Sequence, residues 1–143
     1  MKVLIDTNVI LDFFLARQPQ NEAAKKLFEL AYLAKITLFT TASSITDIYY
    51  ITAKRLGDRT ARDVLRNLFN LLTIITVDRE DCFTALNLPI PDYEDALVTA
   101  CAKKSDMDCI VTQDTDFLNL ENPLPQVVDP SAFLGLLHEG DDS

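Results

Sequence analysis

The 143-residue sequence predicts an α/β protein, a three-layer α/β/α sandwich built around a central parallel sheet. Short apolar runs rich in β-branched residues alternate along the chain with stretches whose apolar residues recur every three to four positions. This alternation is typical of a parallel sheet that helices cover on both faces. The chain has no internal repeat or Gly/Ser-rich linker, and its length suits one domain.

Strands and helices are expected in turn along the chain. Helical spacing is clear where Ala23, Leu27 and Leu30 share one face, and Gly57 with Asp58 separates two helices, the glycine as a left-handed turn and the aspartate as a cap. The expected strands are 2–6, 36–41, 72–77, 109–112 and 126–129, and the expected helices are 7–16, 21–35, 43–54, 58–72 and 91–104.

The composition is that of a globular protein in a reducing compartment. Residues 1–134 are expected to form the single domain, and the acidic residues 135–143 a flexible tail. The three cysteines, Cys82, Cys101 and Cys109, are not spaced as metal ligands and are interpreted as small hydrophobic residues. With no secretory signal and no apolar run of the roughly 18–20 residues that cross a bilayer, we expect a cytoplasmic protein that does not insert into membranes.

The formal net charge of −9 argues against a protein that simply coats nucleic acid, because that task needs a positive surface. Local grouping of basic residues can still provide a binding face.

Aspartates follow two of the expected strands and open one helix. Asp6 follows the first strand, and Asp114 with Asp116 follows the fourth. Asp92 and Asp95 stand at the start of helix 91–104, near Glu94, and Asp47 lies within helix 43–54. Because functional sites in parallel sheets form beyond the carboxyl ends of the strands, these acids can converge on one edge of the sheet.

Each acid also has a structural interpretation. Asp6 and Asp92 are suited to cap the helices that follow them, and Asp114 to form a turn. Asp47 lies in a helix that is apolar enough to be largely buried, so its carboxylate needs a cation or hydrogen-bond donors unless it reaches solvent.

Several carboxylates in one cleft would repel one another, and a hard divalent cation relieves that repulsion. The sequence has no cluster of His or Cys that would suit zinc. An all-oxygen site for Mg²⁺ or Mn²⁺ is therefore the natural candidate.

Four motifs, "VLIDTNVILDF", "SSITDIYYI", "DYEDALVTACA" and "IVTQDTDFLNL", together resemble the PIN domain family, over residues 2 to about 134. This family includes the VapC-type toxin ribonucleases of bacterial toxin–antitoxin pairs. The resemblance implies hydrolysis of single-stranded or loop RNA by a metal-activated water, leaving a 5′-phosphate.

The resemblance also implies the site. Asp6, Asp95 and Asp114 would hold the metal ion. Asp47, at a position where the family usually has glutamate, would hold a second metal ion or orient the attacking water. Supporting roles are expected for Thr7, Asn8, Asp92, Thr112 and Asp116.

The resemblance further implies a homodimer and a cognate antitoxin partner. Arg17 and the helical series Arg59, Arg62 and Arg66 are candidate contacts to RNA phosphates, although the series is also suited to be a solvated face on which Arg59 pairs with Asp63. Two other functions stay open. One is a non-catalytic PIN domain that binds RNA or protein. The other is a haloacid-dehalogenase-like phosphohydrolase, which Asn8 disfavours because that chemistry needs aspartate two residues after the first.

Overall fold

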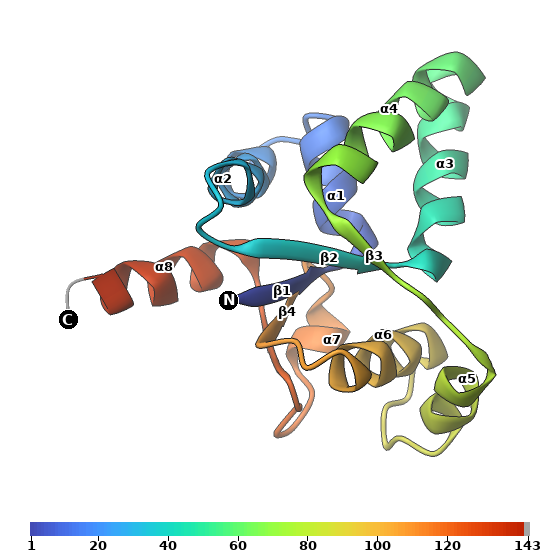
Figure 1. The fold of residues 1–143 in the computed structure, drawn as a ribbon, viewed down its shortest axis with the longest axis vertical. Coiled ribbons are helices and arrows are strands. Elements are labelled where there is room, and N and C mark those ends of the chain that lie inside the picture. The colour runs from blue at the N-terminus through green and yellow to red at the C-terminus, as the bar shows by residue number, and fades with distance from the viewer. Residues whose placement is uncertain (142–143) are drawn as a thin grey trace.

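The computed structural model describes residues 1–141 and the surroundings of side chains as far as residue 138. Five parallel strands form one sheet in the order β3-β2-β1-β4-β5, and helices lie on both sides of it (Figure 1). The strands are β1 Lys2–Ile5, β2 Thr37–Thr41, β3 Thr73–Ile75, β4 Cys109–Val111 and β5 Gln126–Val128; the helices are α1 Thr7–Phe14, α2 Asn21–Tyr32, α3 Ala42–Leu56, α4 Asp58–Leu71, α5 Arg79–Leu86, α6 Tyr93–Lys104, α7 Thr115–Leu118 and α8 Pro130–Asp141.

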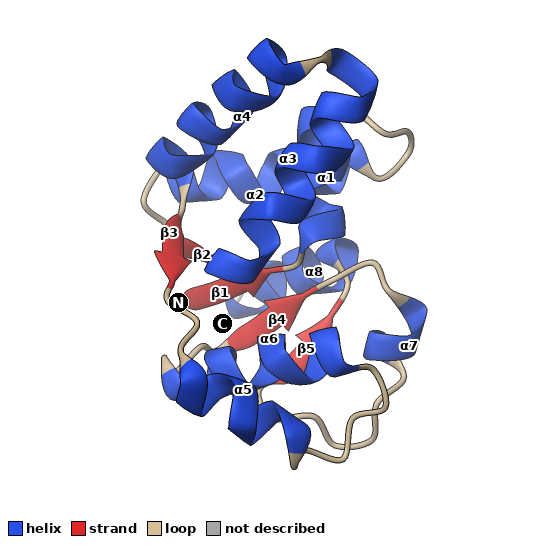
Figure 2. Cartoon of the chain, turned by 90° about the vertical axis from the view of Figure 1, so that its right-hand side faces the viewer, coloured by secondary structure: helices blue, strands red, loops and turns tan. Residues whose placement is uncertain are grey.

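The central strand β1 shows why the molecule has three layers. Val3 and Ile5 point to one face, where they pack with apolar residues of α1, α2 and α4. Leu4 points to the other face and packs with residues of α6 and α7. All three side chains are buried because helices cover both faces of the strand, as the view along the layers shows (Figure 2). The predicted three-layer α/β/α fold is confirmed.

The connection between α3 and α4 differs in part from the prediction. Gly57 has a positive φ of 90°, as expected for a residue that ends a helix where side chains are disfavoured. Asp58, however, is the first residue of α4 and does not cap it, since Gly57 occupies the cap position. Its carboxylate instead accepts hydrogen bonds from Tyr49 and Arg62.

The structure adds three helices that the sequence pattern did not predict, α5, α7 and α8. Helix α8 runs from Pro130 to Asp141, so residues 135–141 are helical where we expected a flexible tail. Leu134 and Leu137 pack against the core beside α2, which explains why the helix continues past the expected boundary. Residues 142–143 of that tail lie outside the described residues.

The cysteines agree with their interpretation as hydrophobic residues. Cys101 and Cys109 are buried, Cys82 is half-buried, and all three are free thiols. Within residues 1–141, no helix combines the length and apolar character needed to cross a membrane.

Candidate metal centre

The neighbouring strands β1 and β4 bring Asp6 and Thr112 together. Ile5 pairs with Val111, so the next residue of each strand lies at the same edge of the sheet. The backbone N–H of Asp6 donates to the Val111 carbonyl oxygen at 2.9 Å. The hydroxyl of Thr112, which is fully buried, donates to Asp6 Oδ2 at 2.9 Å. The parallel sheet therefore places a carboxylate and a hydroxyl side by side at this edge.

Asp6 is both a helix cap and a buried carboxylate. Its backbone is extended, and its Oδ1 accepts from the N–H of Thr7 at 2.9 Å, which caps α1. Burial raises the pKa of Asp6, and the hydrogen bonds from Thr112 and Thr7 oppose that rise. The negative charges of Asp114 and Asp92 raise the pKa further. Capping and a site role are thus compatible at this residue.

A small hydrogen-bond network extends from Thr112 to Asp114. The Thr112 hydroxyl oxygen accepts from Asn8 Nδ2 at 3.3 Å and from the backbone N–H of Asp114 at 3.1 Å. Asn8 Oδ1 in turn accepts from the N–H of Gln113 at 3.1 Å. Asp114 caps the short α7 by accepting from the N–H of Asp116 at 2.9 Å. The loop that follows β4 is therefore fixed against the start of α1, with Asp114 half-buried near Asp6.

Asp95 lies in the first turn of α6 and is only 7 % exposed. Asp92 caps this helix by accepting from the N–H of Asp95 at 3.0 Å, as the sequence predicted. Burial, followed by the charges of Asp92, Asp114, Asp6 and Glu94, raises the pKa of Asp95 to about 7. Helix α6 therefore brings Asp95 near enough to Asp6 and Asp114 for their charges to act on it.

Asp47 is exposed on α3, so of the two positions that the sequence left open, a buried carboxylate or one that reaches solvent, the structure shows the second. Its charge nevertheless acts on Glu94, whose pKa is raised first by burial and then by Asp47 and Asp6. Glu94 was not among the predicted site residues. Its place directly before Asp95, in the first turn of α6, was the sequence signal that could have identified it.

The supporting residues divide into two groups. Thr112 and Asp92 hydrogen-bond directly to Asp6 and Asp95, respectively, whereas Asn8 hydrogen-bonds to Thr112 and Gln113. The Thr7 hydroxyl is buried and has no hydrogen-bond partner among the described residues. Asp116 is exposed, and its backbone N–H donates to the carboxylate of Asp114, which caps α7.

The chemistry of these side chains suits a hard divalent cation. The available ligand atoms are carboxylate, hydroxyl and amide oxygens, and the charges of neighbouring carboxylates contribute to the raised pKa values of Asp6, Glu94 and Asp95. In the observed conformation, however, no three Asp, Glu, His or Cys side chains of the described residues lie close enough together to hold a metal ion. Metal binding would therefore require these carboxylates to rotate towards one another.

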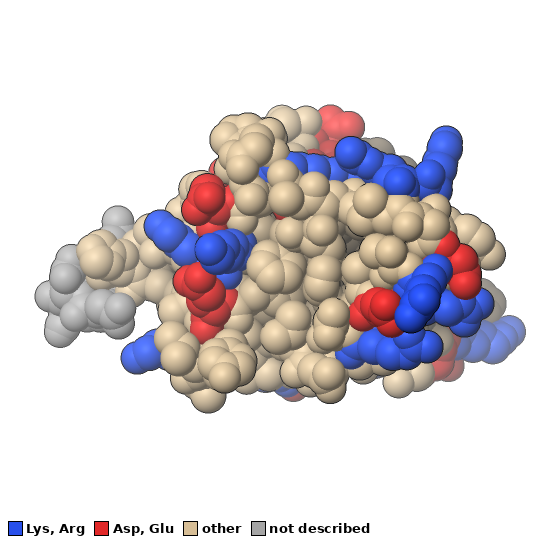
Figure 3. Space-filling model, turned by 90° about the horizontal axis from the view of Figure 1, so that it is seen from above, with Lys and Arg blue, Asp and Glu red and all other residues tan. Residues whose placement is uncertain are grey.

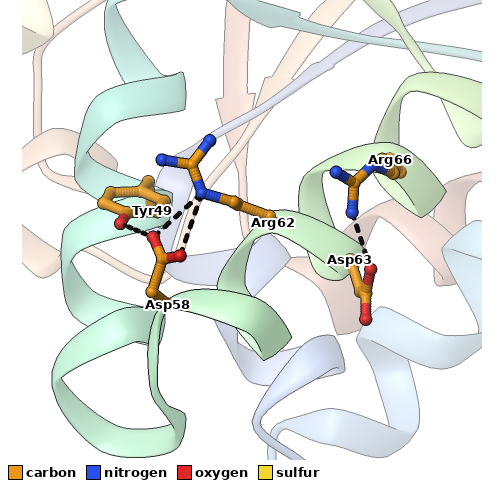
Figure 4. Close-up of polar contacts among 5 residues, drawn as sticks. All are labelled: Tyr49, Asp58, Arg62, Asp63 and Arg66. Atoms are coloured by element: carbon orange, nitrogen blue, oxygen red, sulfur yellow. Dashed lines mark hydrogen bonds and ion pairs between the residues drawn. The ribbon is translucent and has the colours of Figure 1, made fainter.

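The arginines of α4 are exposed, and two of them are paired (Figure 4). Arg62 Nε donates to both oxygens of Asp58, at 2.9 and 3.1 Å, and Arg66 donates to Asp63 at 2.7 Å. The expected pair of Arg59 with Asp63 is replaced by this second contact. In the view from above, basic side chains gather near α3 and α4 with acidic ones among them (Figure 3). Such exposed pairs are weak, so the arginines stay available to a polyanion.

Arg17 lies after α1, apart from the α4 series. It lines an open groove together with Asn8 and Asp114, so it is the predicted phosphate contact that lies next to the carboxylates.

Comparison with known proteins places the chain in a family. The sequence model described as "PIN domain" matches residues 2–116. A curated relative, Ribonuclease VapC1 from Aquifex aeolicus, is 28% identical over 121 residues, which cover 81% of this chain and 83% of the relative.

Solved structures agree with the fold. The toxin VapC20 from Mycobacterium tuberculosis matches with a TM-score of 0.65 at 17% identity, covering 80% of this chain and 92% of that one. A toxin–antitoxin complex from Klebsiella pneumoniae matches with a TM-score of 0.64 at 21% identity, covering 90% of this chain and 97% of the other. Because the family model matches most of this chain and the fold agrees, the chain belongs to the PIN domain family.

Proposed function

We propose that this protein is an endoribonuclease that depends on Mg²⁺ or Mn²⁺ and acts as the toxin of a toxin–antitoxin pair. The observation that carries the proposal is the placement of Asp6, Asp95 and Asp114 at one edge of the sheet, where the charge of Asp114 raises the pKa values of Asp6 and Asp95. A curated relative is named a ribonuclease, and the fold is shared with VapC toxins, which supports RNA as the substrate.

In this proposal each residue has a defined task. Asp6, Asp95 and Asp114 hold the metal ion, and Asp47, across from Glu94, holds a second ion or orients the attacking water. The divalent ion, when bound, acidifies water and offsets charge at the scissile phosphate. Thr112 keeps Asp6 oriented, and Asn8 keeps the loop that carries Asp114 in place. Thr7, Asp92 and Asp116 support the starts of α1, α6 and α7, respectively.

The partners follow from the same reasoning. Structures of VapBC toxin–antitoxin complexes share this fold, which supports a cognate antitoxin for this chain. We also propose a homodimer and a cytoplasmic location, and we propose that Arg59, Arg62 and Arg66 add contacts to RNA phosphates beyond the carboxylate site.

The decisive test is cleavage of a mixed pool of structured and single-stranded RNAs with Mg²⁺ or Mn²⁺. The wild-type protein is expected to cut RNA, leaving 5′-phosphates, and to lose activity in EDTA. Asp6→Asn and Asp95→Asn should each lower the rate by at least about a hundredfold, because each removes charge that stabilises the metal ion and the transition state.

A matched control is Asp106→Asn, which makes the same chemical change. Asp106 precedes β4 and so lies near the opposite edge of the sheet, and its positive φ of 55° is tolerated by asparagine. This variant should cut at the wild-type rate. Equal activity of all three variants would contradict the proposed site.

Two observations favour a second function, a PIN domain that binds RNA or protein without cutting. Among the described residues, the acids are not close enough together to form a metal-binding group, and Asp47 is exposed. Calorimetric titration with Mn²⁺ separates the two functions. Binding that is lost in Asp95→Asn supports the nuclease, whereas no carboxylate-dependent binding supports the binding module.

A further inference from the structure

An open polar groove of about 520 Å³ lies beside the carboxylate site. It shares Asp114 with the candidate metal centre, and Asn8 and Gln113, which hydrogen-bond to each other, connect the two. The described residues that line it are Asn8, Asp12, Arg17, Gln18, Gln20, Gln113 and Asp114, and among these Arg17 alone is a cation. A strand of RNA whose scissile phosphate lies at the carboxylates can extend into this groove.

The end of α1 fixes the backbone of Arg17 in the groove. Ala16 has a left-handed φ of 49°, and its N–H donates to the Phe13 carbonyl oxygen at 3.3 Å. The N–H of Arg17 donates to the Asp12 carbonyl oxygen at 3.1 Å. These two bonds form a Schellman motif, and the carbonyl of Arg17 is held in turn by the N–H of Asn21 at 2.7 Å.

The same motif sets the side chains of Asp12 and Arg17 against each other. These two positions of a Schellman motif usually make an apolar contact. Here they form an ion pair, with 3.8 Å between Arg17 Nη1 and Asp12 Oδ1. An ion pair therefore occupies two positions at which an apolar pair would stabilise the end of α1 equally well.

Asp12 is an unusual residue for its surroundings. It is only 5 % exposed and lies among the apolar residues 9–14 of α1, and its Oδ2 is buried with no hydrogen-bond partner among the described residues. Burial raises the pKa of Asp12, and the charge of Arg17 opposes that rise. A buried carboxylate that is only partly satisfied costs stability, so its presence is best explained by what it does to Arg17.

Arg17 supplies a positive charge beside a site that is rich in carboxylates. Its side chain is 36% exposed, so the guanidinium reaches solvent while Asp12 restrains it from one side. The nearby centre is rich in carboxylates that repel RNA, and a guanidinium can bind a phosphate through two parallel hydrogen bonds. We propose that Arg17 binds an RNA phosphate adjacent to the one that is cleaved, and that Asp12 is the positioning residue that holds Arg17 ready for it. This inference rests on the proposed ribonuclease function.

The test measures cleavage kinetics and RNA binding of the full chain with Mg²⁺, using fluorescein-labelled single-stranded RNA of random sequence and any RNA that the wild-type protein cuts. Arg17→Ala should raise KM roughly five- to tenfold and leave kcat within about twofold, because a phosphate contact away from the reacting atoms binds ground state and transition state alike. It should also reduce the salt dependence of binding by about 0.7 in the logarithmic slope, the value for one phosphate of a single strand.

The control for the lost charge is Lys35→Ala. Lys35 precedes β2 and so lies at the opposite edge of the sheet from the carboxylates, and its removal should leave KM and the salt dependence unchanged. Arg17→Lys should recover only part of the affinity, because an ammonium group cannot form the two parallel bonds.

Asp12 is tested by Asp12→Asn and Asp12→Leu. Both should raise KM as Arg17→Ala does, and the double variant Asp12→Asn with Arg17→Ala should be no worse than Arg17→Ala alone. Asp12→Leu restores the apolar contact usual in the motif, so it should unfold at the wild-type temperature or above while KM still rises. A purely structural Asp12 would instead lower thermal stability and leave KM unchanged.

The outcomes separate the two proposals. If the wild-type protein cuts RNA and Arg17→Ala changes KM no more than Lys35→Ala does, the inference is wrong and the ribonuclease stands. Effects of Asp12→Asn and Arg17→Ala that add in full would also overturn the positioning role. If the wild-type protein neither cuts nor binds the RNA probes, the ribonuclease and the inference both fail.

Discussion

The ionised carboxylate of Asp95 destabilises the folded protein. The capping of α6 by Asp92 places Asp95 in a buried position, and its pKa rises to about 7 through burial and the surrounding negative charges. At neutral pH this carboxylate is therefore partly protonated in the folded protein, whereas it is ionised in the unfolded chain. A bound cation would remove the conflict, so the unfavourable charge is consistent with the proposed metal site.

The raised pKa of Asp95 predicts a fall in stability with rising pH when no metal is bound. The folded state binds the proton more tightly than the unfolded state, so the associated stability is present below about pH 4 and is lost as the pH rises through about 7. The shift corresponds to at most on the order of 4 kcal/mol, at about 1.4 kcal/mol for each tenfold change in proton affinity. Asp95→Asn should therefore unfold at higher urea concentration than the wild type at pH 8, in EDTA.

The same measurement at pH 5 is the control for Asp95→Asn. There the wild-type carboxyl is largely protonated, so the two proteins should differ much less. Equal differences at pH 5 and pH 8 would mean that ionisation of Asp95 does not destabilise the fold.

At the level of elements, α1, α2 and α6 end in the same way. Each is followed by a residue with positive φ, namely Ala16 (49°), Ala34 (58°) and Asp106 (55°). After α2, the N–H of Lys35 donates to the Leu30 carbonyl oxygen at 2.9 Å, which closes the motif. Glycine is the residue that adopts this conformation without strain, so two alanines here are a departure from the preferred sequence.

Replacing Ala34 with glycine should stabilise the protein. Relief of the left-handed conformation is worth roughly 1–2 kcal/mol, and the greater freedom of glycine in the unfolded chain takes back about 0.4–1 kcal/mol. A net gain of about 0.5–1 kcal/mol is expected in the free energy of unfolding from urea titration. Ala34 is exposed, so no packing is lost.

Ala23→Gly provides a matched comparison for Ala34→Gly, because Ala23 lies inside α2 with ordinary helical geometry. This variant should lose about 1 kcal/mol. If both substitutions destabilise the protein, the left-handed ending of α2 does not occur in solution.

At the level of the whole molecule, α3 and α4 project from the sheet (Figure 2), and both carry exposed apolar side chains. Tyr50 and Leu56 on α3 and Phe69 on α4 are 68%, 50% and 53% exposed. Exposed apolar surface of this kind is typical of regions that contact another protein. It supports the proposed homodimer through these helices.

Light scattering after size-exclusion chromatography should give about twice the mass of the chain. Tyr50→Glu should shift the protein towards the monomer, because it places a charge in an apolar interface. Leu124→Glu is the control, since Leu124 is 72% exposed in the loop between α7 and β5. A wild-type monomer, or a dimer that persists in Tyr50→Glu, would contradict an interface at this face.

The layers of this protein, and the edge of the sheet at which its acids gather, follow from the pattern of the sequence alone. Strand and helix periodicities are local, and parallel strands carry their next residues to one edge, so the pattern was enough to predict that Asp6 and Asp114 lie at the same edge of the sheet. The hydrogen bond from Thr112 to Asp6 is seen only in the structure. The caps at Asp6 and Asp92 were predictable for the same reason, because they depend on a few consecutive residues.

Which side chains are buried, and which charges meet, was settled only by the packing of the whole chain. Asp47 is exposed because α3 pairs with α4 and projects from the sheet, and an apolar sequence alone does not show which face a neighbouring helix covers. The structure likewise shows that the charge of Asp47 acts on Glu94. It also shows that Asp12 forms an ion pair with Arg17, which lies beyond the end of α1. Burial and the pairing of charges depend on how elements far apart in the sequence come into contact, and no local pattern contains that information.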